Sequence, residues 1–436
     1  MRAKPPSPQV ELLKTRLDQF VNLNHPLCQL ARVIDWSAFD EVFGGLYCEG
    51  FGRPGKPTRL LVGLHYLKHT YDLSDELVVE QWVENPYWQY FCGGEYFAHE
   101  NPLDPSSLTN WRKRVGESGM ETLLAETIRA GLATGALRRQ SLAKVNVDTT
   151  VQEKAISYPT DAKLYHRLRE KLVDQAQELG IELRQSYRRK SKRALQWQNR
   201  YRHARQVRRA KKELRRLKTY CGRVVRDVER KIAGNELQRQ AFSELLTLGH
   251  RLLSQKGDDQ HKLYSLHAPE VECFAKGKTH KKYEFGSKVS LVTTSRECFV
   301  VGMKSFAGTP YDGHTLAAAL TQAERLGGFQ AKEIYVDRGY RGHNYRGTGL
   351  VHIVGQRWKG LSTSLRRWYK RRSGIEAVIG HAKTDGRLGR NYLLGVKGDQ
   401  INAILSGCGY NLRKLLTVLL FVLFGRRRHN LLSGVA

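Results

Sequence analysis

The segment Tyr369–Lys383 gathers side chains that could hold a metal ion and a phosphate together, and it reads YKRRSGIEAVIGHAK. It is rich in helix formers, with Gly374 as its weak point. On one helix, four side chains would project within a sector of roughly 60°: Tyr369, Arg372, Glu376 and Lys383. A carboxylate can ligate a divalent ion while cations bind phosphate. The alternative is an ordinary solvated charged face.

The other side of this predicted helix is apolar, and its residues are Ile375, Val378, Ile379 and Ala382. An apolar stripe anchors a helix to a core, so we expect the polar stripe to face outward. Gly380 lies on the polar stripe and leaves a bare spot that another backbone could approach.

Two aspartates in other segments could join Glu376. Asp148 lies in the predicted strand Ala143–Val151, where valines alternate with polar residues. A carboxylate is disfavoured in a β-branched strand, so it requires a reason, unless it faces water at a sheet edge. Asp337 ends a short apolar strand that begins at Glu333 and opens into a Gly-rich loop, which suits a metal ligand or a turn.

Asp312 is a competing carboxylate. It precedes a predicted helix that runs from Thr315 to about Leu326. A helix cap explains an aspartate at this position more simply than a metal site does.

Composition favours a nucleic-acid partner. The chain has 436 residues, room for about three domains, and its 73 basic and 42 acidic residues give a net charge of +31. Such a charge is best neutralised by a polyanion. The seven cysteines include no C-x-x-C pair, which argues against disulfides and zinc and for a reducing cytoplasm. The N-terminal segment lacks the apolar h-region typical of a signal peptide. The longest apolar run, Leu415–Phe424, is too short for a membrane span and predicts a buried helix.

Residues 1–140 predict an all-helical N-terminal domain. Pro57-Thr58, Ser74, Asn85-Pro86 and Asp104-Pro105-Ser106 mark helix boundaries. The last of these helices carries three consecutive cations that are candidate DNA contacts: Arg112, Lys113 and Arg114. The domain is either a helix-turn-helix-like DNA reader or a plain helical domain with a basic surface.

Residues 161–265 predict a basic helical or coiled-coil insertion. Between Arg184 and Lys231 there are 20 Lys or Arg residues against 3 acids. An apolar seam with a 3,4 spacing runs through this stretch: Val207, Ala210, Leu214, Leu217, Cys221, Val224 and Val228. The seam should pack against another helix, such as 237–253, or a partner subunit. The outer faces could lie along DNA, with Trp197 and Tyr201 stacking on a base or simply packing.

The β pattern resumes after the insertion. A hairpin is predicted over 281–294 and 299–306, followed by a helix, the strand that ends at Asp337, a strand over Val351–Val354 and the helix with Glu376. Together with the strand of Asp148, this is the element order of an α/β, RNase H-like domain. It spans 141–160 and 266–436 and ends in C-terminal helices. The first and fourth strands of that fold lie side by side, so Asp148 and Asp337 should converge, with Glu376 above them.

Three blocks resemble the DDE transposases of bacterial insertion sequences. The spacing of Tyr369, Arg372, Glu376 and Lys383 matches the Y-R-E-K signature without a gap. The stretches NVDTTVQEKAI and IYVDRGYRG resemble the two catalytic-Asp blocks of the insertion-sequence-5 group, and the N-terminal segment resembles the domain that helps recognise transposon ends. The chain departs from some Y-R-E-K relatives because the 38 residues between Asp337 and Glu376 leave no room for a β-rich insertion.

The resemblance implies a reaction and its participants. Asp148, Asp337 and Glu376 would be catalytic and would bind two Mg²⁺ or Mn²⁺ ions, which suit all-carboxylate ligation and in-line displacement at phosphorus. Water would cut at each transposon end, and the freed 3′-hydroxyl would join target DNA. The implied DNA contacts are Tyr369, Arg372, Lys383, Arg338 and Trp358, the last stacking on a flipped base.

The implied partner is double-stranded DNA, both the terminal inverted repeats and the target, bound by a homodimer in the bacterial cytoplasm at the nucleoid. Three alternatives stay open from the residues: a catalytically inactive, domesticated transposase that binds DNA, a basic RNA-binding protein, and a metal-dependent nuclease of the same fold.

Overall fold

The structure is a computed structural model of the chain that describes all residues except 1–14, 49–53, 276, 278–280, 356–359 and 434–436. It divides into two compact units. The first combines Met1–Glu153 with Ser287–Ala436, and the second is Lys154–Gly286. The second unit is therefore inserted between two parts of the first.

The N-terminal part of the first unit is helical, as predicted. Its helices are α1 (Leu17–Phe20), α2 (Pro26–Val33), α3 (Trp36–Gly44), α4 (Thr58–Thr70), α5 (Asp75–Glu84), α6 (Pro86–Phe91) and α7 (Ser106–Ala133). The predicted boundary signals act as expected: Ser74 Oγ accepts from the backbone N–H of Leu77, and α6 begins at Pro86. Gly116 kinks α7 with a φ of 66°, which glycine adopts without strain.

A mixed six-stranded sheet forms the centre of the α/β part of the chain. Its strands are β1 (Lys144–Glu153), β2 (Glu272–Ala275), β3 (Tyr283–Thr294), β4 (Val300–Phe306), β5 (Glu333–Val336) and β6 (Leu350–Ile353). They are ordered β2-β3-β1-β5-β6, with β4 also paired to β3. The predicted hairpin is confirmed as the antiparallel pair β3–β4. β1 and β5 are parallel neighbours, so the first strand lies beside the fourth strand of the first unit, consistent with an RNase H-like fold.

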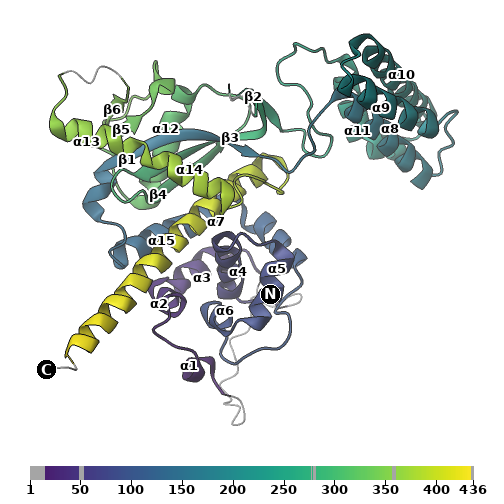
Figure 1. Ribbon diagram of the computed structural model, residues 1–436. Helices are drawn as coiled ribbons and strands as arrows, with labels where there is room; N and C mark the ends of the chain where they lie inside the picture. Colours follow the sequence, from purple (N-terminus) through teal and green to yellow (C-terminus); the bar gives the residue numbers. More distant parts are fainter. Residues whose placement is uncertain (1–14, 49–53, 276, 278–280, 356–359, 434–436) are drawn as a thin grey trace. The chain divides into compact units, whose positions relative to one another are not determined.

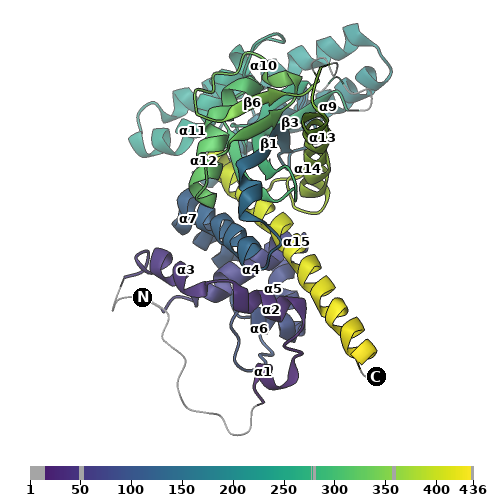
Figure 2. The ribbon, with the colours of Figure 1, turned by 90° about the vertical axis from the view of Figure 1, so that its left-hand side faces the viewer.

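Helices cover both faces of this sheet. Figure 2 shows α12 (Asp312–Gly327) on one side and the pair α13 (Thr363–Arg372) and α14 (Gly374–Thr384) on the other. The long helix α15 (Gly395–Ser433) packs against α7, α4 and β4. It contains the predicted C-terminal apolar run, where Leu415 and Leu419 are buried but Phe421 is exposed. None of the described helices is both long and apolar enough to cross a bilayer.

The second unit is mainly helical and has a core of its own. Figure 1 shows its helices α8 (Asp161–Glu178), α9 (Arg188–His203), α10 (Val207–Ile232) and α11 (Glu236–Ser254). The predicted seam on α10 is buried from Ala210 onward, except for the half-buried Leu214, while Val207 at its start is exposed. It packs against α8, α9 and α11 rather than against α11 alone.

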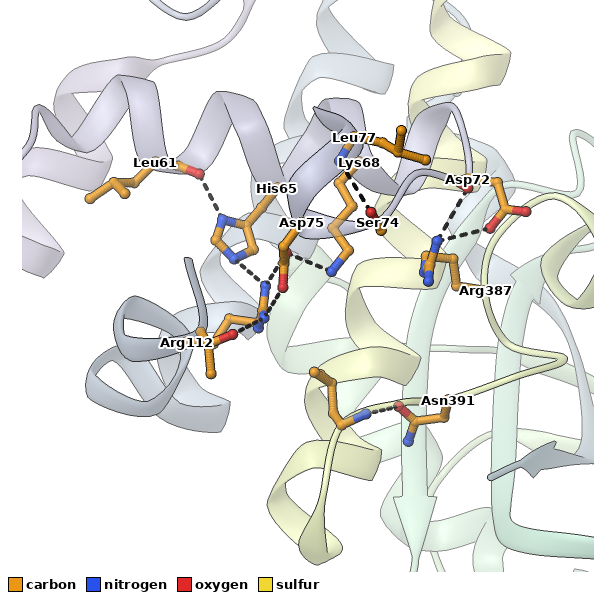
Figure 3. A network of polar contacts seen from close by, with 12 residues as sticks. Leu61, His65, Lys68, Asp72, Ser74, Asp75, Leu77, Arg112, Arg387 and Asn391 are labelled. Carbon is orange, nitrogen blue, oxygen red and sulfur yellow. Dashed lines mark hydrogen bonds and ion pairs between the residues drawn. The ribbon is translucent and has the colours of Figure 1, made fainter. Parts of the chain in front are cut away.

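A buried polar network ties α7 to α4 and α5 (Figure 3). Asp75 accepts hydrogen bonds from Arg112 at 2.9 and 2.6 Å and from Lys68 Nζ at 2.7 Å. Burial pushes the pKa of Asp75 upward, but Arg112 and Lys68 outweigh it and hold that pKa well below its ordinary value. Burial lowers the pKa of Lys68 to about 8. One carboxylate is therefore the shared counter-ion of two buried cations.

Asp75→Asn should lower the free energy of unfolding by about 3–5 kcal/mol, because removing one partner leaves buried charges without a counter-ion. The measurement is a urea denaturation curve followed by circular dichroism. Lys113→Met is the matched control: Lys113 is exposed on the same helix as Arg112, and its loss should change stability by less than about 0.5 kcal/mol. Equal effects of the two substitutions would show that the network adds nothing.

Acid should destabilise the protein below about pH 6.5, because two histidines of α4 are buried in the neutral form. Burial, reinforced by Arg112, lowers the pKa of His65 to about 3, and burial with Lys68 lowers the pKa of His69. Between pH 6.5 and about 3 the unfolded chain binds protons at these histidines that the folded chain does not bind. Stability should then fall by up to about 1.4 kcal/mol per pH unit for each histidine.

The measurement is the urea midpoint across that pH range. His65→Gln should make the slope shallower, since one of the two groups is gone. An unchanged slope in this variant would exclude His65 as a cause.

Candidate active site

The pairing of β1 with β5 brings two aspartates to the same edge of the sheet. Asn146 on β1 is the register partner of Tyr335 on β5. Asp148 and Asp337 each lie two residues beyond that pair. Their side chains are therefore expected at the same height along the two strands and on the same face of the sheet. Asp337 directly follows β5, and its Oδ1 accepts from the N–H of Gly339 at 2.9 Å.

The helix above this edge is interrupted. The segment Tyr369–Lys383 was predicted as one helix, but α13 ends at Arg372 and α14 begins at Gly374, with Ser373 between them. The prediction of one continuous stripe is therefore wrong at this point. The apolar face of α14 is confirmed, since Ile375, Val378 and Ala382 are buried.

Asn146 fixes the end of α13 over β1. Its Nδ2 donates to the carbonyl of Arg371 at 3.3 Å, and its Oδ1 accepts from Ser295 Oγ at 2.7 Å. Asn146 is completely buried and lies on the same face of β1 as Asp148. It therefore holds the neighbouring Arg372 beside Asp148.

The guanidinium of Arg372 contacts all three predicted catalytic carboxylates. Its Nη2 lies 2.6 Å from Asp148 Oδ2 and 3.7 Å from Asp337 Oδ2, and its Nη1 lies 3.1 Å from Glu376 Oε1. Because Nη2 contacts both aspartates, the Oδ2 atoms of Asp148 and Asp337 can be no farther apart than the sum of these two distances. Residues that are 189 and 39 positions apart in the chain thus meet around a single cation.

The three carboxylates differ in exposure. The side chain of Asp148 is 14% exposed, that of Asp337 43% and that of Glu376 64%, while that of Arg372 is 11% exposed. Burial raises the pKa of Asp148 to about 6, Arg372 opposes that rise and Asp337 adds to it. The site is therefore a cation-stabilised acidic cluster in which Asp148 is largely buried and Glu376 is exposed.

Asp312 is a fourth carboxylate next to this acidic cluster. The sequence predicted it as a helix cap, but α12 begins at Asp312 itself, and its Oδ1 accepts from Thr149 Oγ1 at 2.8 Å and Lys288 Nζ at 2.7 Å. The cap prediction is wrong because these partners come from β1 and β3. A methyl group on Gly339 would lie 3.0 Å from Asp337 Oδ1 and 3.2 Å from Asp312 Oδ2, so glycine there lets both carboxylates approach.

The donor set fits a hard divalent cation. Every candidate ligand is a carboxylate oxygen, which Mg²⁺ and Mn²⁺ prefer, and the carboxylates already converge on a positive charge. Among the described residues, no group of three His, Cys, Asp or Glu side chains is arranged to hold a metal ion by itself. Arg372 stands between the carboxylates instead.

The predicted DNA contacts near this acidic cluster differ in burial and in their partners. Tyr369 is buried, and its ring lies edge-on to Tyr335 at 6.2 Å, so it packs on β5 rather than facing outward. Lys383 is half-buried on α14. Arg338 is exposed beside Asp337, and its Nε donates to the carbonyl of Gly355 at 2.8 Å. Trp358 lies outside the described residues.

The three predicted DNA-binding cations of α7 do not share one environment. Arg112 was predicted to contact DNA, but it is buried and paired with Asp75 (Figure 3), so its role in this structure is to hold helices together. Lys113 and Arg114 are exposed, and the Arg114 guanidinium lies 5.0 Å from the ring centroid of Tyr47. The physical reason is helical phase: Arg112 follows the buried Trp111 and faces α5, while the next two positions turn to the surface.

Sequence reasoning missed Asn146 and Lys288 as parts of the site. Asn146 could have been found, because an amide two residues before Asp148, on the same face of a valine-rich strand, also requires a reason. Lys288 gave no such signal, since a single lysine in a strand is ordinary.

Comparisons with known proteins bear on these residues. Residues 15–114 match the family described as "Transposase domain (DUF772)", and residues 260–412 match "Transposase DDE domain". The chain is 56% identical over 204 residues to "Uncharacterized protein ORF8 in nfe locus" of Rhizobium meliloti. The aligned region is 47% of this chain and 98% of that protein. No solved structure matches the chain.

The DDE match contains Asp337, Glu376 and Arg372 but not Asp148, which lies before it. The parallel pairing of β1 with β5 supplies the position of Asp148 independently of that match. The chain therefore belongs to the family of the Rhizobium meliloti protein, and two of its regions match transposase domains, one of them a DDE domain.

Proposed function

We propose that the protein cuts the ends of an insertion sequence and joins them to target DNA, with Asp148, Asp337 and Glu376 as its catalytic carboxylates. The observation that supports this most is the convergence of the three carboxylates on the Arg372 guanidinium. Like charges repel one another at such distances unless a cation neutralises them. A site of this kind suits divalent ions and a phosphate rather than an organic ligand.

Asp148, Asp337 and Glu376 would hold two Mg²⁺ or Mn²⁺ ions. When bound, such ions stabilise the charge on the attacking and leaving oxygens of a phosphodiester. Asp148 is fixed by the N–H of Thr149 at 2.8 Å, and Asp337 by that of Gly339, so two of the ligands are positioned before any ion arrives.

Arg372 would position the DNA. Its two terminal nitrogens can donate in parallel to two oxygens of one phosphate, which aligns the scissile strand. Lys383 would add a point charge farther along α14. In the reaction, a water and then a 3′-hydroxyl would each attack phosphorus in line, and each attack would displace one DNA oxygen.

Within this proposal, we assign the protein to the insertion-sequence-5 group with its Y-R-E-K signature. It would act as a homodimer on terminal inverted repeats at the bacterial nucleoid. Support comes from the net charge of +31 and from the basic helices α9 and α10. The exposed Lys113 and Arg114 of α7 are proposed as contacts to the DNA backbone.

The test is a strand-transfer assay with the purified full-length chain, duplexes carrying the element's terminal inverted repeat, and supercoiled target DNA. We expect joined products in Mg²⁺ or Mn²⁺ and none in EDTA. Cutting without joining would replace the proposal by a nuclease, and binding without cutting would replace it by a DNA-binding protein.

A further inference from the structure

The second unit contains a pocket of its own between α9 and α10. Its volume is about 280 Å³, near the lower end of the roughly 300–1,000 Å³ usual for ligand sites. Eight residues line it: Lys190, Arg193, Ala194, Trp197, Tyr201, Glu213, Arg216 and Tyr220. Three are aromatic, three are cations and one is a carboxylate, so the lining offers both ring faces and charges.

The aromatic side of the pocket is a stacked pair. The rings of Trp197 and Tyr201 lie 5.5 Å apart at 23°, one helical turn apart on α9, and both are half-buried. Tyr220 enters from α10, where it stacks on Tyr187 at 4.8 Å and 15°. Flat, partly accessible rings held by such contacts form a surface on which another flat ring can stack.

Cations surround these rings. Lys190, Arg193 and Arg216 are exposed at the mouth of the pocket. The guanidinium of Arg200 lies 5.3 Å from the Trp197 ring centroid, and that of Arg209 lies 5.7 Å from the Tyr201 centroid. Cations both beside and over aromatic rings suit a ligand that carries a phosphate on one side and a π-system on the other.

Glu213 places one acceptor in this basic pocket. It is buried, and its Oε1 accepts from Arg216 Nη1 at 2.8 Å. A carboxylate among cations can accept a hydrogen bond from the exocyclic amino group of a base. It would also repel a second phosphate, so the pocket favours one base with its own phosphate over a run of phosphates.

We propose that this pocket binds a single unpaired nucleotide of DNA, with its base on the Trp197–Tyr201 pair and its phosphate near Arg193 and Arg216. The inference rests on the proposed function, because that function makes DNA the ligand. A paired base is enclosed in the duplex stack and cannot enter a pocket of this size, so the site distinguishes frayed, flipped or overhanging nucleotides from duplex.

The test uses the full-length chain and a duplex with a short 3′ overhang that contains 2-aminopurine, whose fluorescence is quenched when it stacks. Wild type should quench the probe and bind the overhang duplex more tightly than a blunt duplex of the same sequence. Trp197→Ala should weaken overhang binding about tenfold and abolish quenching, because one stacking contact accounts for an effect of that size. Its affinity for blunt duplex should stay within about twofold.

Two further variants control for folding and for non-specific effects. Trp197→Phe keeps a ring and should retain most of the quenching. Tyr158→Ala removes an exposed aromatic of the same unit outside the pocket and should bind the overhang like wild type. Equal overhang binding by wild type and Trp197→Ala, or an equal loss on blunt duplex, would overturn the proposal.

Three outcomes separate this inference from the proposed function and from an RNA ligand. Normal strand transfer together with no overhang preference refutes the pocket and leaves the transposase proposal intact. Overhang preference in a protein without strand transfer supports the pocket and refutes the transposase proposal. An RNA overhang bound tenfold more tightly than the DNA overhang would refute a DNA nucleotide as the ligand.

Discussion

Asp148→Asn, Asp337→Asn and Glu376→Gln are each expected to reduce cleavage at the element's ends by at least about a thousandfold. That factor corresponds to about 4 kcal/mol of transition-state stabilisation, within what bound metal ions supply at phosphorus. Each substitution removes one negative charge and keeps the size of the side chain. Binding to the end duplex, measured by fluorescence anisotropy, should change by less than about threefold.

Asp385→Asn is the matched control. Asp385 directly follows α14, and its carboxylate lies 2.9 Å from Nδ1 of His381, not at the Arg372 guanidinium. This variant should cleave at nearly the wild-type rate. Near-normal cleavage by any one of the three carboxylate variants would remove that residue from the proposed metal site.

Arg372→Gln is expected to act in opposite directions on two measurements. Without the guanidinium, the carboxylates lose their counter-ion, so free protein should bind Mn²⁺ about tenfold more tightly, equivalent to about 1.4 kcal/mol. Strand transfer should fall by about a hundredfold or more, because the donor that orients the scissile phosphate is lost. Mn²⁺ binding is measured by electron paramagnetic resonance and strand transfer by gel assay.

Arg371→Gln is the neighbouring control, since the Arg371 guanidinium lies over Trp368 at 5.1 Å. It should leave Mn²⁺ binding unchanged. If Arg372→Gln weakened Mn²⁺ binding instead, Arg372 would be supporting the carboxylates as ligands rather than competing with the ions for them.

Much of the scaffold could be predicted because its signals are local. Alternating valines predicted β1, a short apolar run predicted β5, and Ser74 predicted the start of α5; the structure has each of them. The order of these elements then implied that β1 and β5 are neighbours, which their parallel pairing confirms.

Features that depend on distant partners could not be predicted in this way. The break at Ser373 accompanies the burial of Tyr369 against β5 and the contact of Arg372 with Asp148, and neither partner is visible from the segment itself. Arg112 was predicted as a surface cation, because its pairing with Asp75 of α5 is not visible in the sequence of α7. Asp312 looked like a cap because Thr149 and Lys288 come from other strands.

The most direct test of the account is the number of Mn²⁺ ions bound per chain in complex with end duplex, counted by electron paramagnetic resonance in wild type and in the triple variant Asp148→Asn, Asp337→Asn, Glu376→Gln. The account predicts two ions in wild type and none in the triple variant at the same concentration. Equal Mn²⁺ binding by the two proteins would contradict it, because the ions would then be held by other residues.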